Sequence, residues 1–133
     1  MVKMKVMELR DGKHGIDITV RVLEVSEVEA SRTRHGETDF REAIVGDETG
    51  RVKLAVWGEL AYRLKPGSIT RITDAWTTCH RCELELKAGF SSTITEVDDE
   101  SFPTEEEIPE RVPPERTLRL NKKSNRAISD EEE

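Results

Sequence analysis

The sequence predicts an all-β protein whose main unit is a small barrel of about five strands. Short segments in which apolar and polar residues alternate recur between turn-like stretches, and no segment has the length and period of a long helix. One segment also changes the parity of its alternation part-way, which indicates a bulge or a sharp bend. A bent strand allows a small sheet to close on itself. The pattern therefore fits a five-stranded Greek-key barrel, the OB-fold, although other small barrels and sandwiches share it.

The expected strands follow one another through short connections. Residues 16–22 alternate apolar and polar side chains, and the parity then reverses at Leu23. Residues 58–64 are expected to form one or two helical turns between the third and fourth strands, ended by Lys65-Pro66-Gly67. The strands are expected over residues 16–25, 40–45, 51–57, 68–78 and 82–86, with 90–97 continuing the last one. The loops and turns are expected over residues 31–38 and 46–50.

The net charge of −7 is unevenly distributed along the 133 residues. Residues 1–97 hold 15 Lys and Arg against 16 Asp and Glu, whereas residues 98–133 hold 6 against 12. The first part is therefore close to neutral, and its basic groups could still gather on one face. We expect an OB-fold domain over residues 1–112, including a short docked extension, and a disordered charged tail over residues 113–133.

Composition and segment lengths also indicate the cellular setting. The sequence has no apolar run of about 18 residues, and its first residues lack the apolar core of a signal peptide, so we expect a cytoplasmic protein without a membrane span. Two cysteines are too few for a secreted disulfide scaffold. Gln is absent and 37% of the residues are charged, a bias typical of thermophile proteins.

The third expected strand carries the first indication of function. Val52, Leu54 and Val56 share one parity and are expected to face the core. The opposite parity then places Arg51, Lys53 and Trp57 outward, unless Trp57 closes the end of the barrel. On an OB-fold this outer face is the usual oligonucleotide surface, where aromatic rings stack on bases and basic side chains follow phosphates. The fourth strand contains Trp76, but its mixed pattern does not settle which way that ring points.

The segment Cys79-His80-Arg81-Cys82 allows three interpretations. A structural zinc site needs four ligands, and no second cysteine pair or paired histidines are present. A thioredoxin-like redox motif needs a helix after the pair, whereas strand-like sequence lies on both sides here. We therefore expect a hairpin with His80 and Arg81 at its tip and the two cysteines roughly opposite each other, either as free thiols or as a disulfide.

Four segments carry a family resemblance: RVLE at 21–24, EAIVGDETGRVKL at 42–54, VWG at 56–58 and AWTT at 75–78. Together and in this order they closely resemble the single-OB-fold single-stranded DNA-binding (ssDNA-binding) proteins of crenarchaeal archaea. Those proteins are similar in turn to simple eukaryotic ssDNA-binding proteins and to the OB domains of replication protein A. The resemblance covers roughly residues 5–112, including the pieces around Phe102 and Ile108 after the barrel.

The resemblance implies largely sequence-independent ssDNA binding in DNA replication, recombination and repair, by a nucleoid-associated monomer without a cofactor. Three aromatic stacking positions are implied, of which two fall at Trp57 and Trp76 and the third, usually Phe, at His80. Histidine still stacks and adds hydrogen bonding, but we expect weaker binding there with a mild pH dependence. The expected DNA-contacting residues are Arg32, Arg34, Arg51, Lys53, Trp57, Trp76, Thr78, His80 and Arg81.

The tail differs from the family's long Gly/Arg-rich tail, because it is short and ends in an acidic tip formed by Asp130, Glu131, Glu132 and Glu133. The resemblance implies that this tail contacts replication or repair proteins. The acidic tip could also compete with DNA for the basic face.

Other functions remain open at this stage. The chain could be a subunit or interaction module of a replication-protein-A-like complex, or an RNA-binding OB module, since stacking and phosphate contacts exist in both nucleic acids. The sequence shows neither a nucleophile paired with a base nor a glycine loop that could hold a phosphate, so we do not expect an enzyme.

Overall fold

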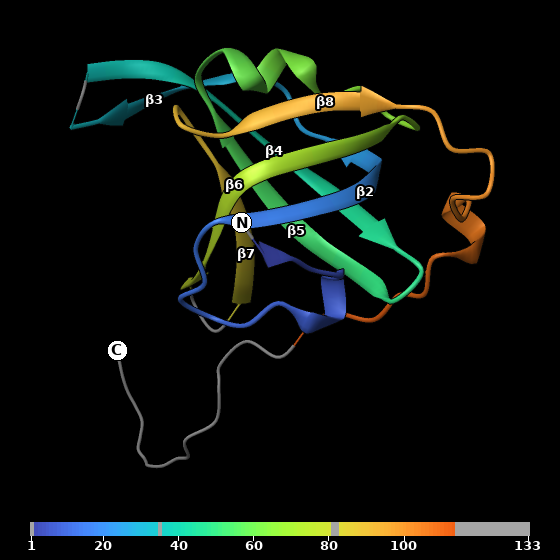
Figure 1. Cartoon of the computed structure of the whole chain (residues 1–133). Coiled ribbons are helices and arrows are strands. Elements are labelled where there is room, and N and C mark those ends of the chain that lie inside the picture. Colours follow the sequence, from blue (N-terminus) through green and yellow to red (C-terminus); the bar gives the residue numbers. More distant parts are fainter. Residues whose placement is uncertain (1, 35, 81–82, 114–133) are drawn as a thin grey trace.

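The computed structural model describes residues 2–34, 36–80 and 83–113 (Figure 1). Five strands form a closed ring, in which β2–β4, β4–β5, β7–β6 and β6–β2 are antiparallel pairs and β5–β7 is parallel. This is the predicted OB-fold barrel. The five strands are β2 (Ile16–Val25), β4 (Gly36–Asp47), β5 (Gly50–Trp57), β6 (Ile69–His80) and β7 (Glu83–Ala88).

Strand β2 closes the barrel because its two halves pair with different neighbours. Its first half pairs with β6 and its second half with β4. The register with β4 shifts between Val22 and Glu24, where the sequence pattern changes parity. The predicted bend in this strand is therefore confirmed, and it allows one strand to serve both edges of the sheet.

Short elements connect or extend the barrel strands. The helical turn predicted between the third and fourth barrel strands is present as a 3-10 helix, η2. It begins at Gly58, whose φ of 79° favours glycine. The short elements are β1 (Val2–Lys3), η1 (Val6–Glu8), β3 (Glu29–Thr33), η2 (Gly58–Arg63), β8 (Thr93–Val97) and η3 (Glu105–Glu107).

Two expected segments were wrong. Residues 31–33 and 36–38 belong to strands rather than to a loop, because β3 pairs with the start of β4 from Glu29↔Phe40 to Thr33↔Gly36. This hairpin projects from the barrel (Figure 1), so both of its faces are polar. Its sequence therefore lacks the alternation of apolar and polar residues that would predict a strand. Residues 90–97 do not continue β7 either. The chain turns back after Gly89, and β8 pairs antiparallel with the first half of β6.

The inside of the barrel is filled by aliphatic side chains. Val52, Leu54 and Val56 point into it, as their parity predicted, and none is more than 3% exposed. The turn between β4 and β5 is held by the buried carboxylate of Asp47, which accepts hydrogen bonds from the backbone N–H of Thr49 and of Val6. This carboxylate therefore fastens η1 under the barrel.

The segment after β8 returns to the barrel beside β4 and β5. Ile108 is 2% exposed, and its Cγ2 would lie 2.7 Å from a Cβ placed at Gly46. The backbone N–H of Arg51 donates to the Arg111 carbonyl at 2.7 Å. Val112, by contrast, is 69% exposed. We call residues 98–113 the C-terminal extension, which covers one end of the β4–β5 pair through Ile108.

No helix within the described ranges is long and apolar enough to cross a membrane.

Candidate nucleic-acid interface

Strands β4, β5, β7 and β6 present one continuous outer face. The register aligns side chains across it in rows: Phe40 with Trp57, Ala55 with Lys87 and Trp76, and Lys53 with Glu85 and Thr78. Alternate residues along these strands, such as Ala43, Leu54 and Leu86, are buried in the core. The outer face comprises Phe40, Glu42, Ile44, Arg51, Lys53, Ala55, Trp57, Trp76, Thr78, Glu83, Glu85 and Lys87.

Trp57 lies at one end of this face, among groups suited to stacking. Its ring is half-buried and lies 5.0 Å from the ring of Phe40, centroid to centroid, with the planes inclined by 49°. The ammonium of Lys87 lies 5.5 Å from the centroid of the Trp57 ring, within the range of a cation–π contact. An aromatic pair with a cation beside it offers a base a π surface and its phosphate a positive charge.

Trp76 lies on the same face, although its strand pattern was ambiguous. The reason is Asp74, whose φ of 57° places it in the left-handed region. Ile72 is buried before this bend and Ala75 after it, so the inward parity changes within the strand. The ring of Trp76 covers Gly89, where an added Cβ would lie 3.0 Å from Cη2. The glycine therefore leaves room for the ring to lie on the sheet.

The cations of the outer face are paired with carboxylates. Lys53 Nζ lies 3.4 Å from Glu83 Oε1, and Lys87 Nζ lies 3.8 Å from Glu85 Oε1. Burial on the sheet would lower the pKa of Lys53, but the hydrogen bond that Lys53 donates to Glu83 and the nearby carboxylates outweigh burial and raise this pKa. Lys53 is therefore charged, and a phosphate that binds either lysine must compete with its carboxylate partner.

Arg51 and Thr78, two of the expected DNA contacts, are both engaged with or buried in the protein itself. Arg51 Nη2 donates to the carbonyls of Ile108 at 3.0 Å and of Glu105 at 3.3 Å, so this guanidinium binds the C-terminal extension. Thr78 is on the outer face, but its Oγ1 is buried and has no hydrogen-bond partner among the described residues. Their roles as DNA contacts stay predictions, and Arg51 also stabilises the position of the C-terminal extension.

The other expected contacts are placed only in part. Arg32 and Arg34 are exposed on the β3–β4 hairpin. They are distant from both tryptophans in the sequence, but the hairpin includes β4, which is one strand of the outer face. The backbone of His80 pairs with Glu83, and Arg81 lies outside the described residues. The acidic tip, Asp130, Glu131, Glu132 and Glu133, also lies outside them.

The β6–β7 hairpin has a different register from the expected one. Cys79 lies opposite Leu84 rather than opposite Cys82, which lies outside the described residues. The side chain of Cys79 is partly buried against the core. Within the described ranges, no group of three His, Cys, Asp or Glu residues could hold a metal ion.

Three side chains near the tryptophans were missed from the sequence. Phe40 and Lys87 come close to Trp57 through strand pairing, and Phe90 lines the same hollow as Trp57 from the turn after β7. Parity on the expected strand 40–45 could have placed Phe40 outward, whereas Lys87 follows the end of the expected strand 82–86. Nothing local in the sequence indicates that Phe90 approaches Gly58, with its Cε1 3.4 Å from the position of an added Cβ.

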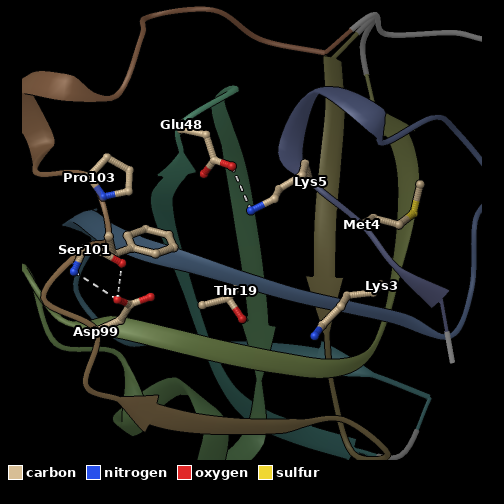
Figure 2. A pocket seen from close by; sticks show the side chains of 9 residues that line it. Lys3, Met4, Lys5, Thr19, Glu48, Asp99, Ser101 and Pro103 are labelled. Atoms are coloured by element: carbon tan, nitrogen blue, oxygen red, sulfur yellow. Dashed lines mark hydrogen bonds and ion pairs between the residues drawn. The ribbon is translucent and has the colours of Figure 1, made fainter.

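A separate hollow of about 510 Å³ lies between the N-terminal segment, β2 and the C-terminal extension (Figure 2). Lys5 Nζ lies 2.8 Å from Glu48 Oε2 there, and Asp99 accepts hydrogen bonds from the N–H and hydroxyl of Ser101. Lys3 also lines it, so two lysines face two carboxylates. The balanced charges favour neither an anion nor a cation, and the hollow is not part of the outer face.

Comparison with known proteins identifies the family. Residues 9–94 match the family described as single-stranded DNA binding protein Ssb-like, OB fold. The chain belongs to this family. It is 43% identical over 109 residues to the single-stranded DNA binding protein Ssb of Saccharolobus solfataricus, an alignment that covers 82% of this chain and 74% of that one. The predicted resemblance to crenarchaeal proteins is thereby confirmed.

Solved structures support the fold independently. The second OB-fold domain of replication protein A from Methanococcus maripaludis is similar with a TM-score of 0.62 and 19% identity, covering 74% of this chain and 97% of that domain. DNA binding domain A of replication protein A from S. cerevisiae gives a TM-score of 0.61 at 18% identity, covering 76% and 99%. At these identities the likeness establishes the OB-fold.

Proposed function

We propose that this protein binds single-stranded DNA, largely independently of sequence, by stacking bases on the rings of Trp57 and Trp76. The observation that carries this proposal is the placement of both tryptophans on one open sheet face, with Lys87 beside the Trp57 ring. A ring that stacks on a base contributes about 1–3 kcal/mol and tolerates any base, because every base has a π face.

The phosphates are contacted by lysines of the outer face and by arginines of the hairpin. Lys87 lies next to Trp76 across the β6–β7 pair, and Lys53 lies one row further from Trp57 along β5. Arg32 and Arg34 extend the positive charge along the β3–β4 hairpin. The third stacking position that the family resemblance implies is His80, and Arg81 follows it in the sequence. Counterion release from these contacts makes the affinity fall as salt rises.

The relatives support single strands as the ligand and binding as the activity. The similar protein from Saccharolobus is named for single-stranded DNA binding. Single-stranded DNA arises in replication, recombination and repair, and these are the processes we assign to the protein. The function we propose is binding without catalysis.

We also propose a division of labour along the chain. Residues 1–112 form the DNA-binding domain with its docked extension, and residues 113–133 form a tail whose acidic tip contacts replication or repair proteins. The tail's last four residues are all acidic, Asp130 to Glu133, so they fit a basic groove on such a partner. The DNA-binding unit is a monomer.

The test is direct binding of the purified full-length chain to three labelled 20-mers: oligo-dT, oligo-U and a DNA duplex. Fluorescence anisotropy should show tightest binding to oligo-dT by the chain alone, weakening as salt is raised. Equal binding to the duplex would overturn the proposed single-strand preference. Tighter binding to oligo-U would assign the protein to RNA, and binding only with an added partner would make it a subunit of a larger complex.

A further inference from the structure

A second hollow adjoins Trp57 at the end of the outer face. Its volume is about 560 Å³, within the range of small-ligand pockets. Three chain segments line it: the start of β4 from Glu37 to Asp39, the end of β5 with the first residues of η2, and the turn after β7. Because Trp57 lines it too, the hollow is continuous with the proposed stacking surface. We call it the Phe90 hollow.

The ring of Phe90 forms an exposed wall of this hollow. It is 69% exposed. Gly58 lies beside it, with a φ of 79° that favours a residue without a side chain, and Phe90 Cε1 lies 3.4 Å from the position of an added Cβ at Gly58, an ordinary van der Waals distance. The ring therefore packs against the backbone at Gly58 and keeps most of its surface accessible.

The turn that carries Phe90 is held in place by Ser92. The Ser92 hydroxyl donates to the Asp74 carbonyl at 2.8 Å and accepts from the Gly89 N–H at 3.1 Å. The Ser92 N–H donates to the Gly89 carbonyl at 2.9 Å. These bonds join the turn to β6 at the same bend that orients Trp76. The exposed ring is thus presented in a fixed position, which lowers the entropic cost of stacking on it.

The charged groups among the described lining residues of the hollow are acidic. Glu37, Asp39 and Glu59 line it, and the described lining residues include no Lys or Arg. Asp39 Oδ2 accepts a hydrogen bond from the Tyr62 hydroxyl at 2.8 Å, which orients this carboxylate. Three carboxylates repel a phosphate, but they accept hydrogen bonds from the exocyclic amino groups of bases.

We infer that the Phe90 hollow takes one base of the bound strand, stacked on Phe90, and that it prefers bases with an exocyclic amino group. Cytosine, adenine and guanine carry such a group, whereas thymine presents carbonyl oxygens and a methyl group instead. The inference rests on the proposed function, since the strand reaches the hollow across Trp57. It makes the protein mildly base-selective at one position and sequence-tolerant elsewhere. It also adds aromatic area at the end of the outer face opposite to His80.

The test compares oligo-dC with oligo-dT of equal length for the full chain and three variants. The parent should bind oligo-dC about 3- to 10-fold more tightly than oligo-dT, the size of one hydrogen-bonded contact. The double variant Glu37→Gln, Glu59→Gln should lose this preference, because an amide can also donate to thymine. Phe90→Leu, which keeps apolar bulk without a π face, should weaken binding to both oligomers roughly 5-fold or more.

The outcomes separate this inference from the proposed function. If Trp57→Ala weakens binding while Phe90→Leu and the double variant bind both oligomers as the parent does, the hollow is not a base site and the outer face still is. If Trp57→Ala also binds both oligomers as the parent does, the proposed function fails together with the inference about the Phe90 hollow. A Lys/Arg-rich peptide can serve as a competitor for the Phe90 hollow. If it weakens the binding of oligo-dC and leaves the binding of oligo-dT to the rest of the face unchanged, the hollow binds a protein partner instead of a base.

Discussion

Replacing Glu83 by Gln is expected to strengthen ssDNA binding, because it frees Lys53 on the outer face. In the free protein Lys53 Nζ lies 3.4 Å from Glu83 Oε1, and the two side chains are 31% and 63% exposed. A pair exposed to this degree is worth about 0.2–1 kcal/mol. A phosphate that takes over Lys53 must forgo that contact, so removing the carboxylate should improve binding by at most about 1 kcal/mol, or roughly 5-fold.

The assay is anisotropy with labelled oligo-dT at several salt concentrations. The gain from Glu83→Gln should be largest at low salt and shrink as salt screens the charges. Glu96→Gln is the matched control, since it also breaks an exposed Lys–Glu pair, Lys65 Nζ to Glu96 Oε1 at 3.8 Å. Glu96 lies on β8, which is hydrogen-bonded to β6 and not to β4, β5 or β7, so this ion pair is outside the outer face.

Two results would refute this reasoning. Unchanged or weaker binding by Glu83→Gln would mean that Lys53 does not exchange its carboxylate for a phosphate. An equal gain in Glu96→Gln would mean that net charge, rather than the pairing on the outer face, limits the affinity.

Three further predictions concern the fold around the interface. Arg51→Ala should lower the free energy of unfolding by about 1–2 kcal/mol in urea denaturation, because hydrogen bonds to the C-terminal extension are lost. It should also change the ssDNA affinity less than Lys53→Ala does. A larger loss of affinity in Arg51→Ala would show that Arg51 contacts the DNA. Gly50→Ala should destabilise by about 1–3 kcal/mol, because its Cβ would lie 2.5 Å from the Arg111 carbonyl oxygen, and an unchanged melting temperature would contradict the docking of that segment. Asp17→Asn should lower the melting temperature at pH 7, because the Arg71 guanidinium holds the pKa of the Asp17 carboxyl below its usual value of 3.8. A carboxyl with a depressed pKa stabilises the folded state at a pH above the pKa that it has in the unfolded chain. The difference in melting temperature between parent and variant should therefore vanish as the pH falls through the folded-state pKa of Asp17. A difference in melting temperature that persists below that pH would exclude this ion pair as its cause.

The barrel could be predicted from the sequence because its strands are half-buried and their alternation is local. The parity change after Val22 was visible for the same reason, and the structure confirms the bend. The β3–β4 hairpin was missed because it has no buried face, so only backbone pairing reveals it. The β8 strand was misplaced because its partner, the first half of β6, is distant in sequence.

The site was predictable only where one strand carries it. Trp57 follows from the parity of β5, whereas Trp76 depends on the left-handed conformation of Asp74, which an aspartate rarely signals in advance. Arg51 has the same parity as Lys53, and its contact with the C-terminal extension spans more than 50 residues. The Phe40 ring packs beside Trp57, and Phe90 lines the same hollow as Trp57, from two separate segments that only the fold brings together.

Tryptophan fluorescence tests the central claim most directly, because the chain contains only two tryptophans and both lie on the outer face. Trp57→Phe and Trp76→Phe each leave one reporter ring. The account predicts that oligo-dT quenches the remaining tryptophan in both variants, and that Trp57→Ala binds roughly 5- to 150-fold more weakly than the parent. Unquenched emission from both variants, together with parental affinity in Trp57→Ala, would contradict stacking on this face.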